Sequence, residues 1–269
     1  MPLVSLRGGW RLATIILAAA TLIGAERPNA AVAPRAATAA TPVKASAAAE
    51  PSPRRAAIVP AMEGLAVDSW PSAEIQAIDR RVLTLALGAA TCAIKSGATT
   101  EPATLTIIDY SKSSLEPRLW VLDLDRRTVA YTELVAHGQG SGGNVPTKFS
   151  NEPDSHQTSL GLFVTEGTYV GRNGYSLRLK GLDRGYNDRA GERAIVMHGA
   201  PYVNDQIGKS LGRLGRSHGC PAVRESVARE IIDHVKGGSL VFSYYPDRDW
   251  LASSAFLNGC GAASTRAAD

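Results

Sequence analysis

The segment GRLGRSHGCPAVRE, residues 212–225, places a serine, a histidine, a glycine and a cysteine in succession between glycine-rich flanks. A cysteine beside a histidine can lose its proton near neutral pH, and the resulting thiolate is a strong nucleophile. Gly219 permits a close approach of the backbone, and the amide groups of Gly219 and Cys220 are placed to receive a developing oxyanion. The segment therefore predicts acyl-transfer chemistry with Cys220 as the nucleophile.

A second histidine stands at the end of the predicted strand RAIVMHG, residues 193–199. His198 is the last strand residue, and Gly199 marks the change from strand to loop, a position that often carries catalytic side chains. The loop-rich connection that follows can fold back and bring Cys220 near His198. Both His198 and His218 are candidates for the general base. We favour His198, because a base on a separate rigid strand holds its geometry better.

Two other interpretations of the cysteine are open. Cys220 could be an inert core residue, although SHGCP between glycine-rich loops is a poor place to bury an apolar side chain. His198, His218 and Cys220 also have the ligand types of a zinc site. No obvious fourth ligand and no Cys-x-x-Cys or His-x-x-x-His spacing accompanies them. We therefore expect neither a metal nor another cofactor.

The elements that must position these residues are mostly short strands. The period-2 pattern and the β-branched and aromatic residues predict strands at residues 103–110, 118–124, 128–137, 160–167, 175–182, 193–199 and 239–245. An apolar stripe from Ile75 to Cys92 predicts one helix, and a second stripe from Val227 to Val235 predicts another. The expected fold is mainly β (α+β), a sandwich or open barrel with two principal helices.

The N-terminal residues predict export. Arg7 and Arg11 precede an apolar run, residues 12–25, that has the length of a signal-peptide core and is too short to span a bilayer comfortably. We expect a signal peptide at residues 1–25, or at 1–33 if cleavage follows Ala33, with an uncleaved anchor as the alternative. The mature chain would lie in the periplasm or cell wall, without a transmembrane span.

The remaining organisation follows from composition. Residues 26–68 are dominated by Ala and Pro and predict a disordered linker. We expect a catalytic domain at residues 69–250 and a loose tail at 251–269. The net charge is only +4 and no dense Lys/Arg run is present, so nucleic acid is not an expected partner. No feature of the sequence indicates an oligomeric state.

The chain has three cysteines, so at most two can pair within it. Cys92 lies on the apolar stripe of the first helix, which favours either a buried small side chain or a disulfide with Cys260. Because an exported protein meets an oxidising compartment, pairing of Cys92 with Cys260 would leave Cys220 as the free thiol.

The motif MHGAPYV followed after a loop by SHGC resembles the signature of the L,D-transpeptidase catalytic domain, the YkuD-like family. GRSHGCPAV, with HGQGSG at 137–142 and SLGLF at 159–163, is similar to the murein L,D-transpeptidase branch of that family. The resemblance extends from about Thr104 to Tyr245. It implies a YkuD-like fold and peptidoglycan stem peptides as the substrate.

The resemblance also implies roles for individual residues. Cys220 would attack the carbonyl of the third stem residue, expel the terminal D-Ala and pass the acyl group to an amine on a neighbouring stem. His198 would be the base, oriented by a backbone carbonyl, and His218 a supporting group. Ser217 and Gly219 would shape the turn.

Three further residues are candidates for substrate binding. Arg216 and Tyr202 lie next to the motif and could bind the carboxylate of the stem peptide and flank its acyl chain, or pack on the surface. His137 could contact substrate or cap a strand before the flexible GQGSGG segment.

The sequence departs from the family pattern after the nucleophile. The family commonly has an apolar residue and then Asn or Arg, whereas this chain has Pro221 and Ala222. Arg216 or Arg224 could supply the missing polar group. Because of this departure, two alternatives to cross-linking stay open: hydrolysis of the acyl-enzyme by a carboxypeptidase or endopeptidase, and a catalytically idle wall-binding module.

Overall fold

The computed structural model describes residues 65–260. The expected signal peptide, most of the expected linker and the last nine residues of the expected tail lie outside the described residues. Within the described part of the chain, no helix is long and apolar enough to cross a bilayer.

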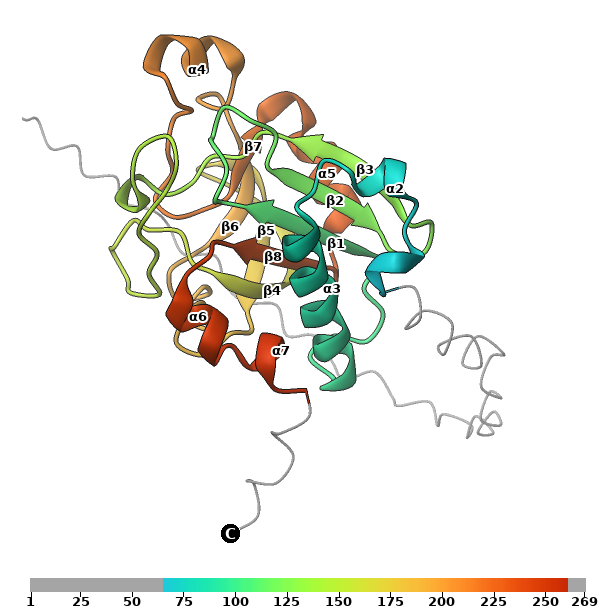
Figure 1. Cartoon of the computed structure of the whole chain (residues 1–269). Helices are drawn as coiled ribbons and strands as arrows, with labels where there is room; N and C mark the ends of the chain where they lie inside the picture. The colour runs from blue at the N-terminus through green and yellow to red at the C-terminus, as the bar shows by residue number, and fades with distance from the viewer. Residues whose placement is uncertain (1–64, 261–269) are drawn as a thin grey trace, which may run out of the picture. The chain divides into compact units, whose positions relative to one another are not determined.

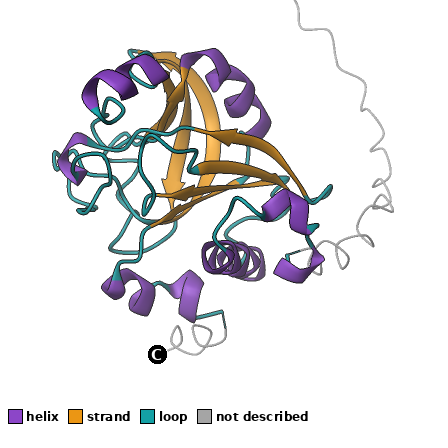
Figure 2. Cartoon of the chain, turned by 45° about the horizontal axis from the view of Figure 1, so that its top comes forward, coloured by secondary structure: helices purple, strands orange, loops and turns teal. Residues whose placement is uncertain are grey.

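Eight strands form one sheet in the order β3-β2-β1-β8-β4-β5-β6-β7. Ala136, just after β3, bridges Ala222 in β7, so the chain at one edge of the sheet touches the other edge. The sheet is therefore curled and nearly closed (Figures 1 and 2), which confirms the expected mainly β fold. The strands are β1 (Thr104–Asp109), β2 (Leu119–Asp123), β3 (Thr128–Glu133), β4 (Gly161–Gly171), β5 (Gly174–Gly181), β6 (Val196–Ala200), β7 (Ala222–Arg224) and β8 (Leu240–Tyr244).

Seven of these strands overlap the predicted segments, and β2 and β3 pair as an antiparallel hairpin. β6 continues to Ala200, which corrects the expectation that this strand ends at His198 and gives way to a loop at Gly199. The strand that the sequence did not predict is β7, which has only three residues and begins just after Cys220 and Pro221. It pairs in parallel with β6. A segment this short and next to a proline has no periodicity of its own, so only the neighbouring strand makes it extended.

The two principal helices cover opposite faces of the sheet. Every residue of β1 is buried, with Ile107 in the apolar cluster of helix α3 (Arg80–Lys95) and Ile108 in that of helix α5 (Glu225–Val235). Figure 1 shows α3 in front of the sheet. Because successive side chains of a strand point to opposite faces, a strand covered on both faces is buried throughout its length.

The first helix begins later than its apolar stripe predicts. Ile75 ends a separate short helix, α2 (Ser72–Ile75), and α3 starts at Arg80. The Asp79 carboxylate accepts hydrogen bonds from the amides of Arg81 and Val82 at 2.8 and 3.1 Å. This N-cap satisfies amides that have no partner within the helix and sets its start. Other short elements are η2 (Val67–Ser69), η3 (Gln139–Ser141) and α4 (Asp205–Leu211).

The C-terminal segment is ordered as far as Cys260, which corrects the expected loose tail from residue 251. It forms two short helices, α6 (Arg248–Ser253) and α7 (Ala255–Asn258). Trp250 is fully buried against Phe242 and Tyr244 of β8. Burial of a large indole explains the order, because its apolar area offsets the entropy lost by the segment.

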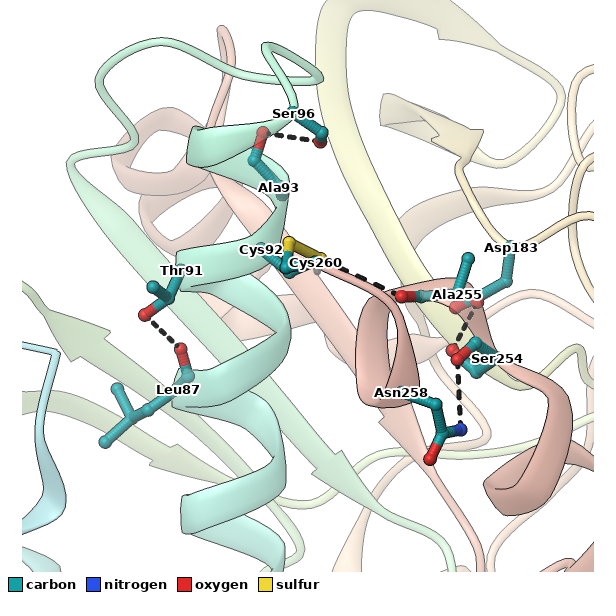
Figure 3. Close-up of a disulfide and its surroundings, with 10 residues drawn as sticks. All are labelled: Leu87, Thr91, Cys92, Ala93, Ser96, Asp183, Ser254, Ala255, Asn258 and Cys260. Carbon is teal, nitrogen blue, oxygen red and sulfur yellow. Dashed lines mark hydrogen bonds between the residues drawn. A yellow bond between two sulfur atoms is a disulfide. The ribbon is translucent and has the colours of Figure 1, made fainter. Parts of the chain in front are cut away.

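A disulfide joins Cys92 of α3 to Cys260, just after α7 (Figure 3). The hypothesis of this pairing is confirmed, and Cys220 is the free cysteine. The same segment is held a second time by Ser254, whose hydroxyl donates to the buried Asp183 carboxylate at 2.6 Å. The C-terminal helices are therefore part of the folded domain.

We expect loss of this disulfide to lower the free energy of unfolding by about 2–4 kcal/mol. The bridge joins residues 168 positions apart, so its removal increases the conformational entropy of the unfolded chain. Urea unfolding of the Cys92→Ser/Cys260→Ser variant against the wild type measures the change, with Cys220→Ala as the control that keeps the bridge. Coincident unfolding curves of the double variant and wild type would contradict the expectation.

Candidate active site

Cys220 stands at the end of a tight turn that a serine side chain closes. The Ser217 hydroxyl donates to the Cys220 carbonyl at 2.7 Å and accepts from the Gly219 amide at 3.1 Å. Ser217 and Gly219 therefore shape the turn, as expected. The Gly219 amide already has a partner, however, which corrects its expected use as an oxyanion donor.

Glycine is required at position 219 for two reasons. Its φ is +119°, in the region where side chains are strained. A Cβ here would also lie 2.7 Å from the Gln157 carbonyl oxygen and 3.1 Å from the Ile195 side chain. The turn is thus wedged between the loop that contains Gln157 and the lead-in to β6.

The other side of the turn is fixed by a neighbouring segment of backbone. The Ser217 amide donates to the His137 carbonyl at 3.0 Å, and the Gln139 amide donates to the Ser217 carbonyl at 2.8 Å. Together with the β6–β7 pairing that follows Cys220, these bonds hold the turn from both ends. Such support by rigid elements is what a positioned nucleophile needs.

His198 is brought close to Cys220 by the register of β6 and β7. His198 pairs with Ala222, and its amide donates to the Pro221 carbonyl at 3.4 Å. Cys220 stands two residues before Ala222, so the β6–β7 pairing brings the chain around Cys220 alongside β6, although 21 residues separate it from His198 in the sequence.

The Gly199 carbonyl determines the tautomer of the buried His198 ring. His198 Nδ1 lies 2.9 Å from this oxygen, which can only accept a hydrogen bond. In the neutral ring Nδ1 is therefore protonated and Nε2 is free to accept a proton. Gly199 has a packing role as well, because a Cβ there would lie 2.8 Å from the Ala228 side chain of α5.

The resting charges of the two residues follow from burial. Burial raises the pKa of the Cys220 thiol, against hydrogen bonds from the amides of Val196 and Cys220 and the positive charge of Arg193. Burial also lowers the pKa of His198, against the hydrogen bond to Gly199. The favoured pair at neutral pH is thus a neutral thiol and a neutral imidazole. The thiolate must be generated by proton transfer rather than stored as an ion pair.

His218 lies outside this buried pair. Its side chain is exposed and stacks on His156, with ring centroids 4.1 Å apart and an interplanar angle of 9°. His156 Nδ1 is in turn 2.9 Å from the side-chain Nε2 of Gln139. The stack joins the turn of residues 217–220 to the loop that carries His156, a geometry that suits a supporting group better than a base.

His137 is buried, which corrects its expected contact with substrate. Only 1% of its surface is exposed, and its Nδ1 accepts from the buried Arg118 guanidinium at 2.8 Å. Burial, followed by the charge of Arg118, lowers the pKa of His137 to about 3. The ring therefore stays neutral and acts in packing, while its carbonyl supports the catalytic turn.

The arginines that were expected to act near the site have other partners. Arg216 donates to the Gly142 carbonyl at 2.6 Å and to the Gln139 carbonyl at 3.3 Å. Arg224 binds the Glu133 carboxylate through two nitrogens. Arg216 thus holds the loop after β3, and its contact with substrate stays a prediction. Arg224 is committed to an ion pair.

Tyr202 lies near the site, as expected. Burial and the negative charge of the Cys220 thiolate raise its pKa to about 12. Its ring packs on Gly215, where a Cβ would clash with it. The phenol is half-buried, and its contact with substrate stays a prediction.

Sequence reasoning did not identify Arg193 or His156 as residues of the site. Arg193 is the arginine whose charge acts on Cys220, and His156 stacks on His218. Neither belongs to a motif, and both come into contact with the turn only through folding. Within residues 65–260, no group of three or more His, Cys, Asp and Glu side chains is arranged to share a metal ion.

Comparison with known proteins identifies the family to which this chain is similar. A family model described as the L,D-transpeptidase catalytic domain matches residues 74–244, which is well over half of the chain. The match includes Cys220, His198 and every strand of the sheet. No curated protein matches the chain.

Several solved structures are similar to the chain at low sequence identity. An L,D-transpeptidase from Mycobacterium smegmatis is 16% identical with a TM-score of 0.33, and the match covers 53% of this chain and 59% of that one. An L,D-transpeptidase from Xylanimonas cellulosilytica is 17% identical with a TM-score of 0.31, and the match covers 54% of this chain and 62% of that one. An L,D-transpeptidase from Stackebrandtia nassauensis is 14% identical with a TM-score of 0.33, and the match covers 65% of this chain and 74% of that one. The chain thus spans about three-fifths of the first two.

Proposed function

This chain belongs to the L,D-transpeptidase catalytic-domain family, and we propose that it cross-links peptidoglycan stem peptides through a thioester on Cys220. The observation that carries the proposal is the placement of the free Cys220 thiol beside strand β6, where His198 has an unprotonated Nε2. Acyl transfer by covalent catalysis needs a nucleophile and a general base, each held in position by rigid backbone.

In the proposed acylation, His198 Nε2 takes the thiol proton and Cys220 Sγ attacks the carbonyl of the third stem residue. The tetrahedral oxyanion collapses, the bond to the terminal D-Ala breaks, and the departing amine takes the proton from His198. We assign the oxyanion to the Cys220 amide, which faces its own sulfur, because the Gly219 amide is bonded to Ser217.

In the second half of the reaction an amine of a neighbouring stem attacks the thioester. His198 accepts the amine proton and returns it to the sulfur as the thioester breaks, which regenerates the thiol and leaves a new amide bond. Tyr202 and Arg216 are the residues that we propose for contacts with the stem peptide. Water in place of the amine would give hydrolysis through the same intermediate.

The test uses purified protein and a disaccharide tetrapeptide, with products and intact protein followed by mass spectrometry. We expect a cross-linked dimer, one released D-Ala per dimer, and a transient adduct on the peptide that contains Cys220. A shortened monomer without dimer would show that the protein is a hydrolase. Binding to sacculi with no adduct and no product would favour the idle module and overturn the proposal.

We also propose that the protein acts outside the cytoplasm, in the periplasm or cell wall. The Cys92–Cys260 disulfide supports this location, because structural disulfides are typical of oxidising compartments. N-terminal sequencing of protein recovered from the cell envelope tests the proposal. Recovery of the uncleaved chain from the cytoplasm would contradict it.

The lowered pKa of His198 predicts that acylation persists into mildly acidic solution. A base is lost only as the pH falls through its own pKa, and burial moves that pKa below its ordinary value of 6.5. We expect the acidic limb of the kcat/KM profile for acylation to lie below pH 6.5. His218→Gln should leave this limb in place. A limb above pH 7 would contradict the expectation, because the base would then be protonated more readily than an ordinary imidazole.

A further inference from the structure

Arg193 is a charged residue beside the nucleophile that the proposed mechanism leaves without a role. It lies just before β6 and is half-buried. Its guanidinium donates only to uncharged oxygens, all in the loop of residues 150–159. These acceptors are the Ser150 carbonyl at 2.7 Å, the Ser159 hydroxyl at 2.5 Å, the Gln157 carbonyl at 2.6 Å and the Ser155 hydroxyl at 3.2 Å.

This guanidinium reaches the residue before the nucleophile. A Cβ on Gly219 would lie 3.3 Å from Arg193 Nη2 and 2.7 Å from Gln157 O, which accepts from the same nitrogen. Arg193 and its acceptor therefore form the wall against which the catalytic turn packs. The left-handed φ of Gly219 brings the turn this close.

The charge of Arg193 is not neutralised by a carboxylate of its own. Glu152, the nearest acid that acts on it, is 2.6 Å from Arg189. Arg189 also binds Glu192 at 2.9 Å. Among the ion pairs of residues 65–260, none includes Arg193. A half-buried cation with neutral partners is screened less by water than a fully exposed one, so its field still acts on other charges nearby.

The other arginines near the motif do not supply such a field. Arg216 is bound to carbonyls of the loop after β3, and Arg224 is paired with Glu133. The effects on Arg193 and Cys220 are mutual: each charge favours the ionised form of the other. Of the three, Arg193 is the one that acts on the sulfur.

We propose that Arg193 is a positioning residue that stabilises the negative charge on Cys220 during proton transfer to His198 and holds the 150–157 loop against the catalytic turn. The inference rests on the proposed function, in that Cys220 is taken as the nucleophile. The thiolate exists only between deprotonation and attack, so Arg193 contributes to kcat for acylation and little to KM.

The test measures the thiol pKa of Cys220 from the pH dependence of its alkylation by iodoacetamide. Cys220 is the free thiol of the oxidised protein, so the rate reports on it alone. We expect Arg193→Met to raise the thiol pKa by about one unit, which slows alkylation near neutral pH about tenfold. The kcat for acylation should fall by a similar factor with KM within about twofold.

Three variants separate charge from architecture. Arg193→Gln keeps hydrogen-bond donors without the charge and should behave as Arg193→Met does, also serving if the methionine variant fails to fold. Arg193→Lys keeps the charge and should retain a thiol pKa near that of the wild type. Arg229→Met removes a guanidinium that stacks on Tyr175 rather than on the turn. It should change neither the rate of alkylation nor the kcat for acylation.

A purely structural role would lower the melting temperature of the neutral variants and leave the alkylation profile unchanged, which would overturn the inference. A lysine variant as slow as the methionine variant would overturn it as well. Alkylation needs no turnover, so the two proposals fail separately. An active enzyme with an unshifted thiol pKa removes the role of Arg193 alone, whereas a shifted pKa without acylation removes the transpeptidase proposal.

Discussion

Replacing Cys220 with alanine is expected to reduce acylation by about 10⁴-fold or more, to the background without enzyme. No other free thiol is present in the oxidised protein, and a methyl group cannot form the thioester through which transfer passes. Single-turnover mass spectrometry with the disaccharide tetrapeptide measures the loss, as absence of both the adduct and the released D-Ala.

The first control for the Cys220→Ala variant is that it still folds. Cys220 is 8% exposed, and its thiol donates only weakly, at 3.8 Å to the Ala194 carbonyl, so we expect near-native circular dichroism. Cys92→Ser/Cys260→Ser, which removes the other two sulfurs, should retain activity below its melting temperature. Product formation by a folded Cys220→Ala protein would contradict the assignment of the nucleophile.

Replacing His198 with glutamine is expected to slow acylation by about 10²–10⁴-fold. The amide side chain is similar in size and can still donate to the Gly199 carbonyl, but it cannot accept the thiol proton at neutral pH. The raised pKa of the Cys220 thiol leaves little thiolate at that pH. Almost every enzyme molecule therefore needs the base to remove the thiol proton, and the variant lacks it. Stopped-flow acylation at pH 7 measures the effect.

The matched control for this variant is His218→Gln. His218 is exposed and stacks on His156, so its loss should cost less than about tenfold, through looser support of the turn. Equal losses in the two variants, or a larger loss in His218→Gln, would transfer the role of base to His218. A His198 variant whose rate recovers at high pH, where the thiol ionises without help, would support the assignment further.

The residues that carry out the proposed chemistry could be predicted because their relations are local. Ser217, Gly219 and Cys220 form one turn within four residues. The strand pattern of residues 193–199 places His198 on β6, although His198 is the middle residue of β6 rather than its last. The strands and the apolar stripe of α5 were predicted on the same ground, since periodicity reports which face of an element is buried. The resemblance to L,D-transpeptidases, carried by the same motif, is confirmed by the family match.

Partners far apart in the chain could not be predicted in this way. The acceptors of Arg193 lie 34 to 43 residues before it, and nothing in the sequence distinguishes Arg193 from Arg216 or Arg224. For His137 the sequence left contact with substrate and capping of a strand as alternatives, and the side chain is buried against Arg118. The helices after residue 247 depend on the burial of Trp250, which only the assembled sheet provides.

The sequence by itself therefore determined the types of chemical group and the local geometry of the turn and strand that present them. The tertiary structure alone decided which arginine packs against the turn of residues 217–220, which histidine is buried and in which direction burial moves the pKa values of the thiol and the imidazole. The physical reason is that pKa values and ion-pair partners depend on desolvation and on distances between charges. These quantities exist only once segments remote in sequence have packed together.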